Sequence, residues 1–96
     1  MTLRITGFIW LDQYVDKLLQ KHHVTTDEVE ALFDSRPHYR FVEKGYVPGE
    51  NLYVALGQLE SGRYLAIFFI HKLDGRALVI SARKMNEDEK RLYARR

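Results

Sequence analysis

The hydrophobic pattern of this chain changes its period once, near Pro37, and that change constrains the fold more than any other feature. Before Pro37, two segments repeat their apolar residues at helical spacing. After it, the chain alternates or runs apolar over strand lengths, with turn residues between the runs. Helices followed by a series of strands indicate an α+β fold with an antiparallel sheet packed on helices.

The part before Pro37 predicts one short strand, at residues 7–10, and two helices. Asp12 is expected to cap the first helix, over 13–22, whose apolar face carries Tyr14, Val15, Leu18 and Leu19. In the second helix, Thr25 and Glu28 have the spacing of a capping box, and the inner stripe is Val29, Leu32 and Phe33. Pro37 stops this helix, because the residue before a proline is pushed out of the α region.

Four strands and a closing helix are predicted after Pro37. The strands are expected at 38–44, 51–59, 63–72 and 76–84, with short hairpin turns at "ESG" and "LDG". The run "IFFI" does not alternate, which is typical of a central strand covered on both faces. Asn86, with Glu89 three residues later, starts the last helix.

These elements predict one domain over residues 1–96. Two N-terminal helices and one C-terminal helix would pack on a four- to five-stranded, mainly antiparallel sheet. The composition, 46% apolar and 29% charged, is that of a globular chain. No apolar run approaches the roughly 20 residues that span a bilayer, and no signal peptide precedes the first strand. With no cysteine in the sequence, we expect a cytoplasmic protein that does not associate with membranes.

Charge is unevenly distributed along the chain. Residues 1–61 hold six Lys/Arg and nine Asp/Glu, whereas residues 62–96 hold nine Lys/Arg and four Asp/Glu. The basic C-terminal part favours a polyanionic partner, although folding can mix the charges on one surface.

Several kinds of site are disfavoured by the residue pattern. The six glycines are isolated at turns, so no phosphate-binding glycine loop is present. His22 and His23 are adjacent, and adjacent histidines do not have the spacing of metal ligands. The serines lack a nucleophile elbow. We therefore predict neither a cofactor nor a metal.

A cluster of polar residues remains in the C-terminal half. Arg63 opens one expected strand and Arg83 closes the next, so both side chains are expected at the same edge of the sheet, where paired guanidinium groups suit a phosphate. Glu89 and Tyr93 lie on one helix face. Arg76, Lys84 and Lys90 add positive charge. The alternative is that these residues form ordinary solvated ion pairs and that Tyr93 covers the core.

Three stretches give the sequence a resemblance to a known family. Trp10 follows a short strand, "KHHV" occupies 21–24, and an amphipathic helix ending in "LF" comes next. Later come "ALGQLESGRYLAIFFI" and "ISARKMNEDEKRLY", the latter being the most specific mark. Over about residues 8–94, the chain resembles the BrnT toxins of bacterial type II toxin–antitoxin systems.

This resemblance implies a RelE-like fold and metal-independent cleavage of messenger RNA, in which the ribose 2′-hydroxyl attacks its own phosphate. It also implies a small antitoxin, with the ribbon-helix-helix type as the candidate class. Arg83 would hold the phosphate, Glu89 and Tyr93 would line the groove, and His22 would be the general base. The alternative for His22 is a cap on the first helix. The predicted catalytic residues are thus Arg63, Arg83, Glu89, His22 and Tyr93, and the predicted RNA contacts are Arg76, Lys84, Lys90, Trp10 and Lys21.

The chain departs from the family pattern at several positions. Leu11, Tyr14, Leu18, His23 and Leu78 replace residues that are usually Asp, Lys, Asn, Gly and Arg, and a Glu-Arg pair is weakened to "ENLY". Two alternatives therefore stay open beside the enzyme: a weak or inactive toxin that binds an antitoxin, and a regulatory module that binds RNA without cutting it.

Overall fold

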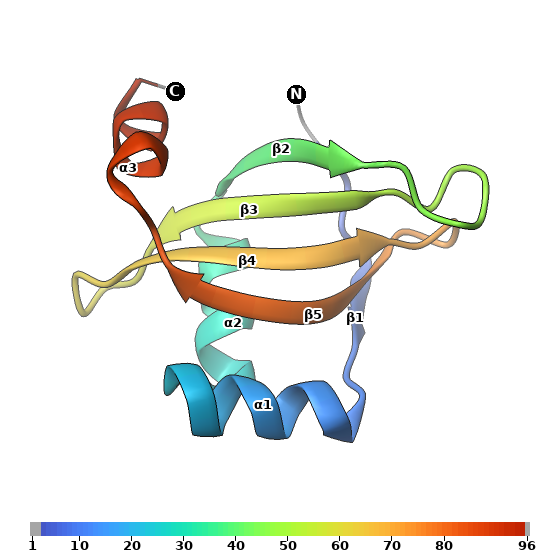
Figure 1. Cartoon of the computed structure of the whole chain (residues 1–96), viewed down its shortest axis with the longest axis horizontal. Coiled ribbons are helices and arrows are strands. Elements are labelled where there is room, and N and C mark those ends of the chain that lie inside the picture. Colours follow the sequence, from blue (N-terminus) through green and yellow to red (C-terminus); the bar gives the residue numbers. More distant parts are fainter. Residues whose placement is uncertain (1–2, 96) are drawn as a thin grey trace.

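A computed structural model describes residues 3–95 and confirms the predicted order of elements. The chain runs through β1 (Gly7–Ile9), α1 (Asp12–His22), α2 (Thr26–Asp34), β2 (His38–Glu43), β3 (Leu52–Gln58), β4 (Tyr64–His71), β5 (Arg76–Lys84) and α3 (Glu87–Ala94). The architecture is α+β, with three helices and one five-stranded sheet (Figure 1).

The sheet has the strand order β1-β5-β4-β3-β2, so β4 is central and β2 is an edge strand. Strands β2 to β5 are antiparallel, and β1 pairs with β5 in parallel. Gly62 and Gly75 have φ angles of 98° and 93° in the two hairpin turns, a conformation that glycine adopts without strain. The "ESG" and "LDG" turns therefore close the hairpins as predicted.

Capping explains where the helices begin. Thr25 with Glu28, and Asn86 with Glu89, form reciprocal capping boxes that start α2 and α3. The prediction that Asp12 caps α1 is wrong: Leu11 is the N-cap, and Asp12 is the first helical residue, where its charge favours the helix dipole. No helix within residues 3–95 is long and apolar enough to cross a membrane.

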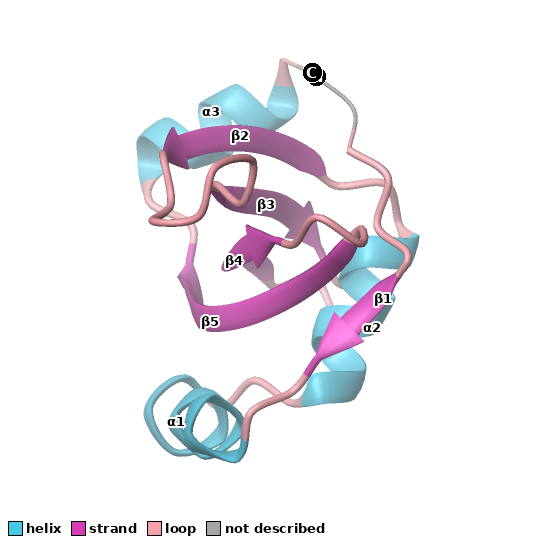
Figure 2. Ribbon diagram, turned by 90° about the vertical axis from the view of Figure 1, so that its right-hand side faces the viewer, coloured by secondary structure: helices cyan, strands magenta, loops and turns pink. Residues whose placement is uncertain are grey.

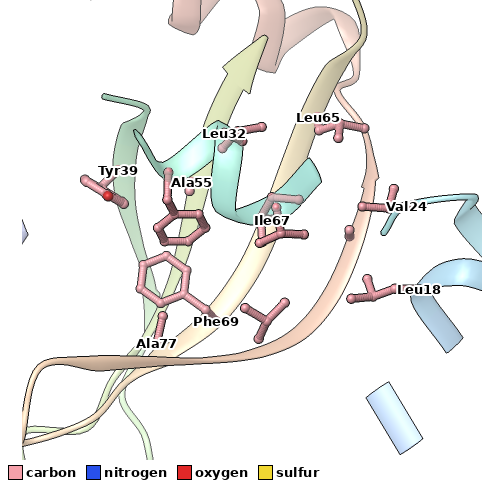
Figure 3. Close-up of a cluster of buried hydrophobic side chains, with 13 residues drawn as sticks. Leu18, Val24, Leu32, Tyr39, Ala55, Leu65, Ile67, Phe69 and Ala77 are labelled. Carbon is pink, nitrogen blue, oxygen red and sulfur yellow. The ribbon is translucent and has the colours of Figure 1, made fainter. Parts of the chain in front are cut away.

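Helices α1 and α2 cover one face of the sheet (Figures 1 and 3). Their Leu18, Val29 and Leu32 are buried against Ile67 and Phe69 of β4. At Gly57 the Leu32 side chain comes so close that a Cβ atom would lie 2.8 Å from it, which explains the glycine in β3. Leu19, predicted on the inner face of α1, is instead 53% exposed, because only Leu18 of that helix reaches the core.

The opposite face is covered only in part (Figure 2), and α3 packs at the end where β4 begins (Figure 1). Leu92 and Tyr93 of α3 contact a small cluster of Val54, Leu56, Ala66 and Met85. Further along this face, Phe68 and Ile70 of the central strand are only half-buried. The "IFFI" strand is central as predicted, but its cover is complete on one face alone.

Candidate active site

Arg83 and Glu89 form a two-pronged ion pair where β5 leads into α3. The two guanidinium NH2 groups donate hydrogen bonds of 2.6 and 2.8 Å to the two carboxylate oxygens of Glu89. The guanidinium also lies 5.2 Å from the centre of the Phe68 ring, which gives it a cation–π contact. The Glu89 side chain is 17% exposed and that of Arg83 is 40% exposed, so solvent reaches the pair mainly from the arginine side.

The start of α3 fixes the carboxylate in place. Glu89 accepts a hydrogen bond from the backbone N–H of Asn86, and the Asn86 side chain accepts one from the backbone N–H of Glu89. Burial raises the pKa of Glu89, but the hydrogen bonds from Arg83 and Asn86 outweigh burial, so the pKa is lowered overall. The hydrogen bonds to Glu89 also raise the pKa of Arg83. Both groups are therefore charged at neutral pH.

Arg40 of β2 shares this groove and was missed by the sequence analysis. A cavity of about 250 Å³ is lined by Arg40, Phe68, Arg83 and Glu89 together with apolar residues of β2, β3 and α3. Within residues 3–95, no hydrogen bond or ion pair engages the Arg40 side chain. The alternation in "HYRFVE" does contain a signal, because Tyr39 is buried and Arg40 must then face the other way.

Tyr93, Lys90 and Lys84 lie around the same end of the sheet. The Tyr93 ring makes an edge contact with Tyr64, at 6.1 Å between ring centres, and Lys90 Nζ lies 5.5 Å from the centre of the Tyr64 ring. Lys84 is exposed at the end of β5. Tyr93 also packs on the apolar cluster under α3, as the covering alternative expects, and its contact with RNA stays a prediction.

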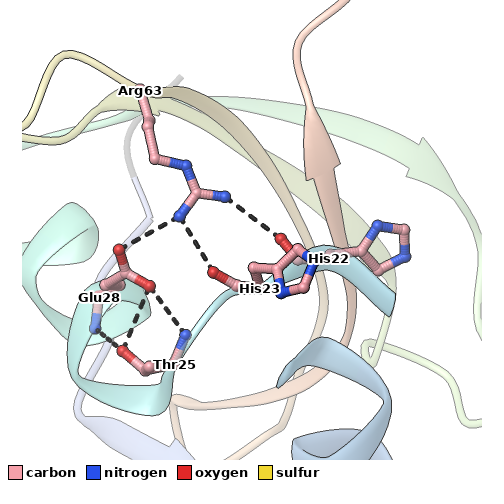
Figure 4. A network of polar contacts seen from close by, with 5 residues as sticks. All are labelled: His22, His23, Thr25, Glu28 and Arg63. Carbon is pink, nitrogen blue, oxygen red and sulfur yellow. Dashed lines mark hydrogen bonds and ion pairs between the residues drawn. The ribbon is translucent and has the colours of Figure 1, made fainter. Parts of the chain in front are cut away.

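Arg63 does not share a site with Arg83, and this part of the prediction is wrong. The Arg63 guanidinium donates hydrogen bonds to the backbone carbonyls of His22 and His23 and to the Glu28 carboxylate, at 3.0 to 3.3 Å (Figure 4). These partners belong to the face that α1 and α2 cover. Arg63 joins the end of α1 to the start of α2, whereas Arg83 contacts α3 on the opposite face.

A β-bulge in β5 is the physical cause of this separation. Near the hairpin turn, Ile70 pairs with Leu78 and Phe69 with Val79, but beyond the bulge Phe68 pairs with Ser81 and Ala66 with Arg83. An unbroken ladder would place Arg83 opposite Leu65, on the face to which Arg63 turns. The extra residue moves Arg83 to the other face, because side chains alternate along a strand.

The other predicted residues lie apart from the Arg83 groove. The His22 carbonyl takes part in the Arg63 cluster. Trp10 stacks on Phe8 and donates a hydrogen bond to Glu30 on the α2 side. Arg76 begins β5, at the opposite end of that strand from Arg83, and pairs with Asp74. Lys21 is exposed in the last turn of α1. Within residues 3–95, no three His, Cys, Asp or Glu side chains gather as metal ligands.

Comparison with known families agrees with these observations. The family described as "Ribonuclease toxin, BrnT, of type II toxin-antitoxin system" matches residues 10–89, which is most of the chain. This chain belongs to the BrnT family. A comparison with curated proteins gives no match.

Membership in the BrnT family confirms the predicted class of activity. The protein is an endoribonuclease toxin of a type II toxin–antitoxin system, and a cognate antitoxin is its partner. The matched range includes Arg40, Arg83 and Glu89 and ends at Glu89. The matched range therefore stops within α3 and does not include Tyr93.

Proposed function

We propose that this BrnT protein cleaves messenger RNA in the groove between β2 and α3, without a metal ion, and that Arg83, Arg40 and Glu89 carry out the reaction. The observation that supports this most is that two arginines and one carboxylate, from β2, β5 and α3, line one cavity. Two cations beside a carboxylate suit a reaction in which an anionic phosphate is bound and a proton is removed.

The two arginines have different roles in this proposal. Arg40 has no partner within residues 3–95, so it can bind a phosphate without breaking an existing contact. Arg83 must exchange the carboxylate of Glu89 for a phosphate oxygen, and its forked donors suit either partner. Each charge-assisted contact contributes about 1.5–3 kcal/mol where water is partly excluded. Loss of one arginine should therefore cost roughly 10- to 100-fold in RNA affinity.

Glu89 is the proposed general base, in place of His22. While Arg83 donates to it, its pKa is low and it is a weak base. When a phosphate takes Arg83 away, the carboxylate stays largely buried but loses that stabilisation, and its pKa rises. It then accepts the proton of the ribose 2′-hydroxyl. The 2′-oxygen attacks the phosphorus, the 5′-oxygen leaves with a proton from water, and a 2′,3′-cyclic phosphate remains on the upstream fragment.

The course of the bound RNA follows from the positions of five side chains: Arg40, Arg83, Lys90, Tyr64 and Tyr93. The two arginines would hold consecutive phosphates, and Lys90 with the tyrosine rings would meet a neighbouring nucleotide beside α3. A messenger RNA substrate favours the cytoplasm as the location of the protein. The resemblance to BrnT proteins favours an antitoxin of the ribbon-helix-helix type.

The direct test is cleavage of a defined single-stranded RNA by the purified protein in excess EDTA. We expect cleavage to persist, to yield 2′,3′-cyclic phosphate ends, and to stop when the ribose at the cleaved position is replaced by 2′-deoxyribose. Arg83→Ala should lose at least tenfold in rate. Arg76→Ala is the matched control, because that arginine lies at the other end of β5 and should leave the rate unchanged.

Two outcomes would overturn this proposal. Cleavage that EDTA abolishes and Mg²⁺ restores would assign the chemistry to a metal. Equal rates for wild type and Arg83→Ala would place the site elsewhere on the protein.

A further inference from the structure

Most of the exposed large apolar side chains of this protein gather at one end of the sheet. Seven are exposed within residues 3–95, and five of them belong to the end of β2, the loop that follows, and the β4–β5 hairpin: Phe41, Val42, Tyr46, Val47 and Leu73. Tyr46 is fully exposed, and Val47 is 47% exposed. Exposed apolar residues that gather at one end of a protein mark an interaction site more often than scattered ones do.

A cavity of about 410 Å³ lies beside these residues, and we call it the loop groove. Its walls include Tyr46 and Val47 of the 44–51 loop, and its floor includes Leu52, Ile70 and Ile80 of three strands. Leu52 and Ile70 are direct cross-strand partners, so they point to the same face as Val54 and Phe68 beside the Arg83 groove. The loop groove therefore continues the partly covered face on which we place RNA cleavage.

The 44–51 loop is held in one shape by specific contacts. Glu50, which is 9% exposed, accepts hydrogen bonds from Lys72 Nζ at 2.7 Å and from the Leu73 backbone N–H at 3.1 Å. The Asn51 side chain accepts one from the Gly45 backbone N–H. A Cβ atom at Gly45 would lie 1.8 Å from the Glu50 carbonyl oxygen, so the closed loop requires glycine there. A surface that is already ordered loses little entropy when a partner binds.

The unpaired cation nearest the loop groove on the RNA side is Arg40. The charges that line the loop groove balance, because Lys72 pairs with Glu50, and Glu43 stands beside Lys44. Arg40 lies earlier on β2, where it lines the Arg83 groove, and its side chain has no hydrogen bond or ion pair within residues 3–95. An apolar segment that carries an acidic side chain would therefore fit the loop groove and Arg40 together. RNA is a poor occupant of the loop groove, because the groove floor is aliphatic.

We propose that the cognate antitoxin docks an apolar segment in the loop groove and pairs an acidic side chain of that segment with Arg40. Membership in a type II family supplies a protein partner, the loop groove supplies an apolar and ordered surface, and Arg40 supplies an unpaired cation on the adjoining part of the same face. The inference rests on the proposed function in one respect: covering Arg40 removes a phosphate-binding residue and so blocks RNA. The antitoxin would then neutralise the toxin by blocking the Arg83 groove from the β2 side.

The test uses the cognate antitoxin, which is identified as the protein whose co-expression relieves growth arrest by this chain. We expect Val47→Asp to raise its dissociation constant by at least about 30-fold, the range of an interface hot spot. Leu19→Asp is the matched control, because Leu19 is equally exposed on α1, away from the groove, and should change the constant by less than about threefold. RNA cleavage by each free variant should equal that of wild type.

A photo-crosslinking residue at position 46 gives a second readout that does not depend on weakening the complex. It should capture the antitoxin, whereas the same residue at position 19 should not. The proposal is overturned if Val47→Asp binds as tightly as wild type. It is overturned equally if free Val47→Asp loses RNA binding, or if the free toxin is a dimer that Val47→Asp dissociates. Cleavage by the free variants is measured separately from antitoxin binding. Failure of the proposed active site can therefore be distinguished from failure of the proposed docking surface.

Discussion

Arg83 and Glu89 hold each other by two short hydrogen bonds across the junction between β5 and α3. The same carboxylate accepts the Asn86 backbone N–H that begins α3, so one side chain both caps the helix and neutralises the arginine. A phosphate must therefore compete with Glu89 for Arg83. We therefore propose two roles for the Glu89 carboxylate: it competes with RNA for Arg83, and it acts as the general base.

Glu89→Gln separates these two roles. Glutamine preserves the capping box but removes the charge that competes for Arg83, so RNA affinity should rise, by about threefold or more. Cleavage should fall by at least 100-fold, because the amide cannot accept the 2′-hydroxyl proton. Binding is measured by anisotropy with a 2′-deoxy-substituted RNA, and cleavage by single-turnover kinetics. Asp88→Asn, which alters an exposed neighbour paired with Arg91, is the control. Weaker RNA binding by Glu89→Gln would contradict the proposed competition.

Acid stability should also depend on Glu89. Its pKa in the folded protein is lowered, so it contributes stability at pH values above the ordinary glutamate pKa of 4.5, and this contribution is lost as the pH falls through the lower folded value. Urea unfolding between pH 7 and pH 3 should therefore show a weaker decline for Glu89→Gln than for wild type. The pKa of Glu50 is also lowered, by its hydrogen bonds from Lys72 and Leu73. The Glu89→Gln variant should therefore still lose some stability as the pH falls, because Glu50 is protonated. Parallel pH profiles for the two proteins would show that the Arg83 pair adds no stability.

Local chemistry made most of the fold predictable. The capping boxes at Thr25 and Asn86 and the glycines of the two hairpins act over a few residues, and each was visible in the sequence. The register of β5 could not be predicted, because no glycine or proline marks the bulge beside Ile80 in the sequence. That one residue decides which face Arg83 occupies. It turned a predicted Arg63–Arg83 site into two separate clusters.

The residues of the candidate site that are close in sequence could be predicted, and the one that is distant in sequence could not. Arg83, Glu89 and Tyr93 are close in sequence and stay close in space. Arg40 joins them from β2 only through the pairing of β2 with β3 and of β3 with β4, which places Arg40, Val54 and Phe68 in one row across the sheet. Such a long-range row requires the strand order, and the sequence pattern alone does not supply it.

Arg40→Ala should weaken RNA binding without destabilising the protein. The side chain has no partner within residues 3–95, so its loss removes a phosphate contact and little else. We expect about a tenfold higher dissociation constant, and a plot of log affinity against log salt concentration whose slope falls by about 0.7, the value for one contact to single-stranded RNA. Lys17→Ala, at an exposed position of α1, is the control. An unchanged salt slope for Arg40→Ala would exclude Arg40 from the RNA path.

Arg63→Ala should do the opposite and lower stability while leaving the intrinsic chemistry unchanged. Its guanidinium satisfies the carbonyls of His22 and His23, at the end of α1, and the Glu28 carboxylate in the first turn of α2. Water can replace part of these contacts, because the Arg63 side chain is 31% exposed. We therefore expect a loss of about 1–2 kcal/mol in the free energy of unfolding, measured with urea.

The matched variant for Arg63 is Arg76→Ala. Arg76 pairs only with exposed Asp74, so its removal should cost less than about 0.5 kcal/mol. RNA cleavage is then compared at a temperature at which all three proteins are fully folded. Equal single-turnover rates for wild type and Arg63→Ala would establish Arg63 as a clamp between the two N-terminal helices. A rate loss as large as that of Arg83→Ala, with stability unchanged, would instead return Arg63 to the active site and contradict the separation of the two faces.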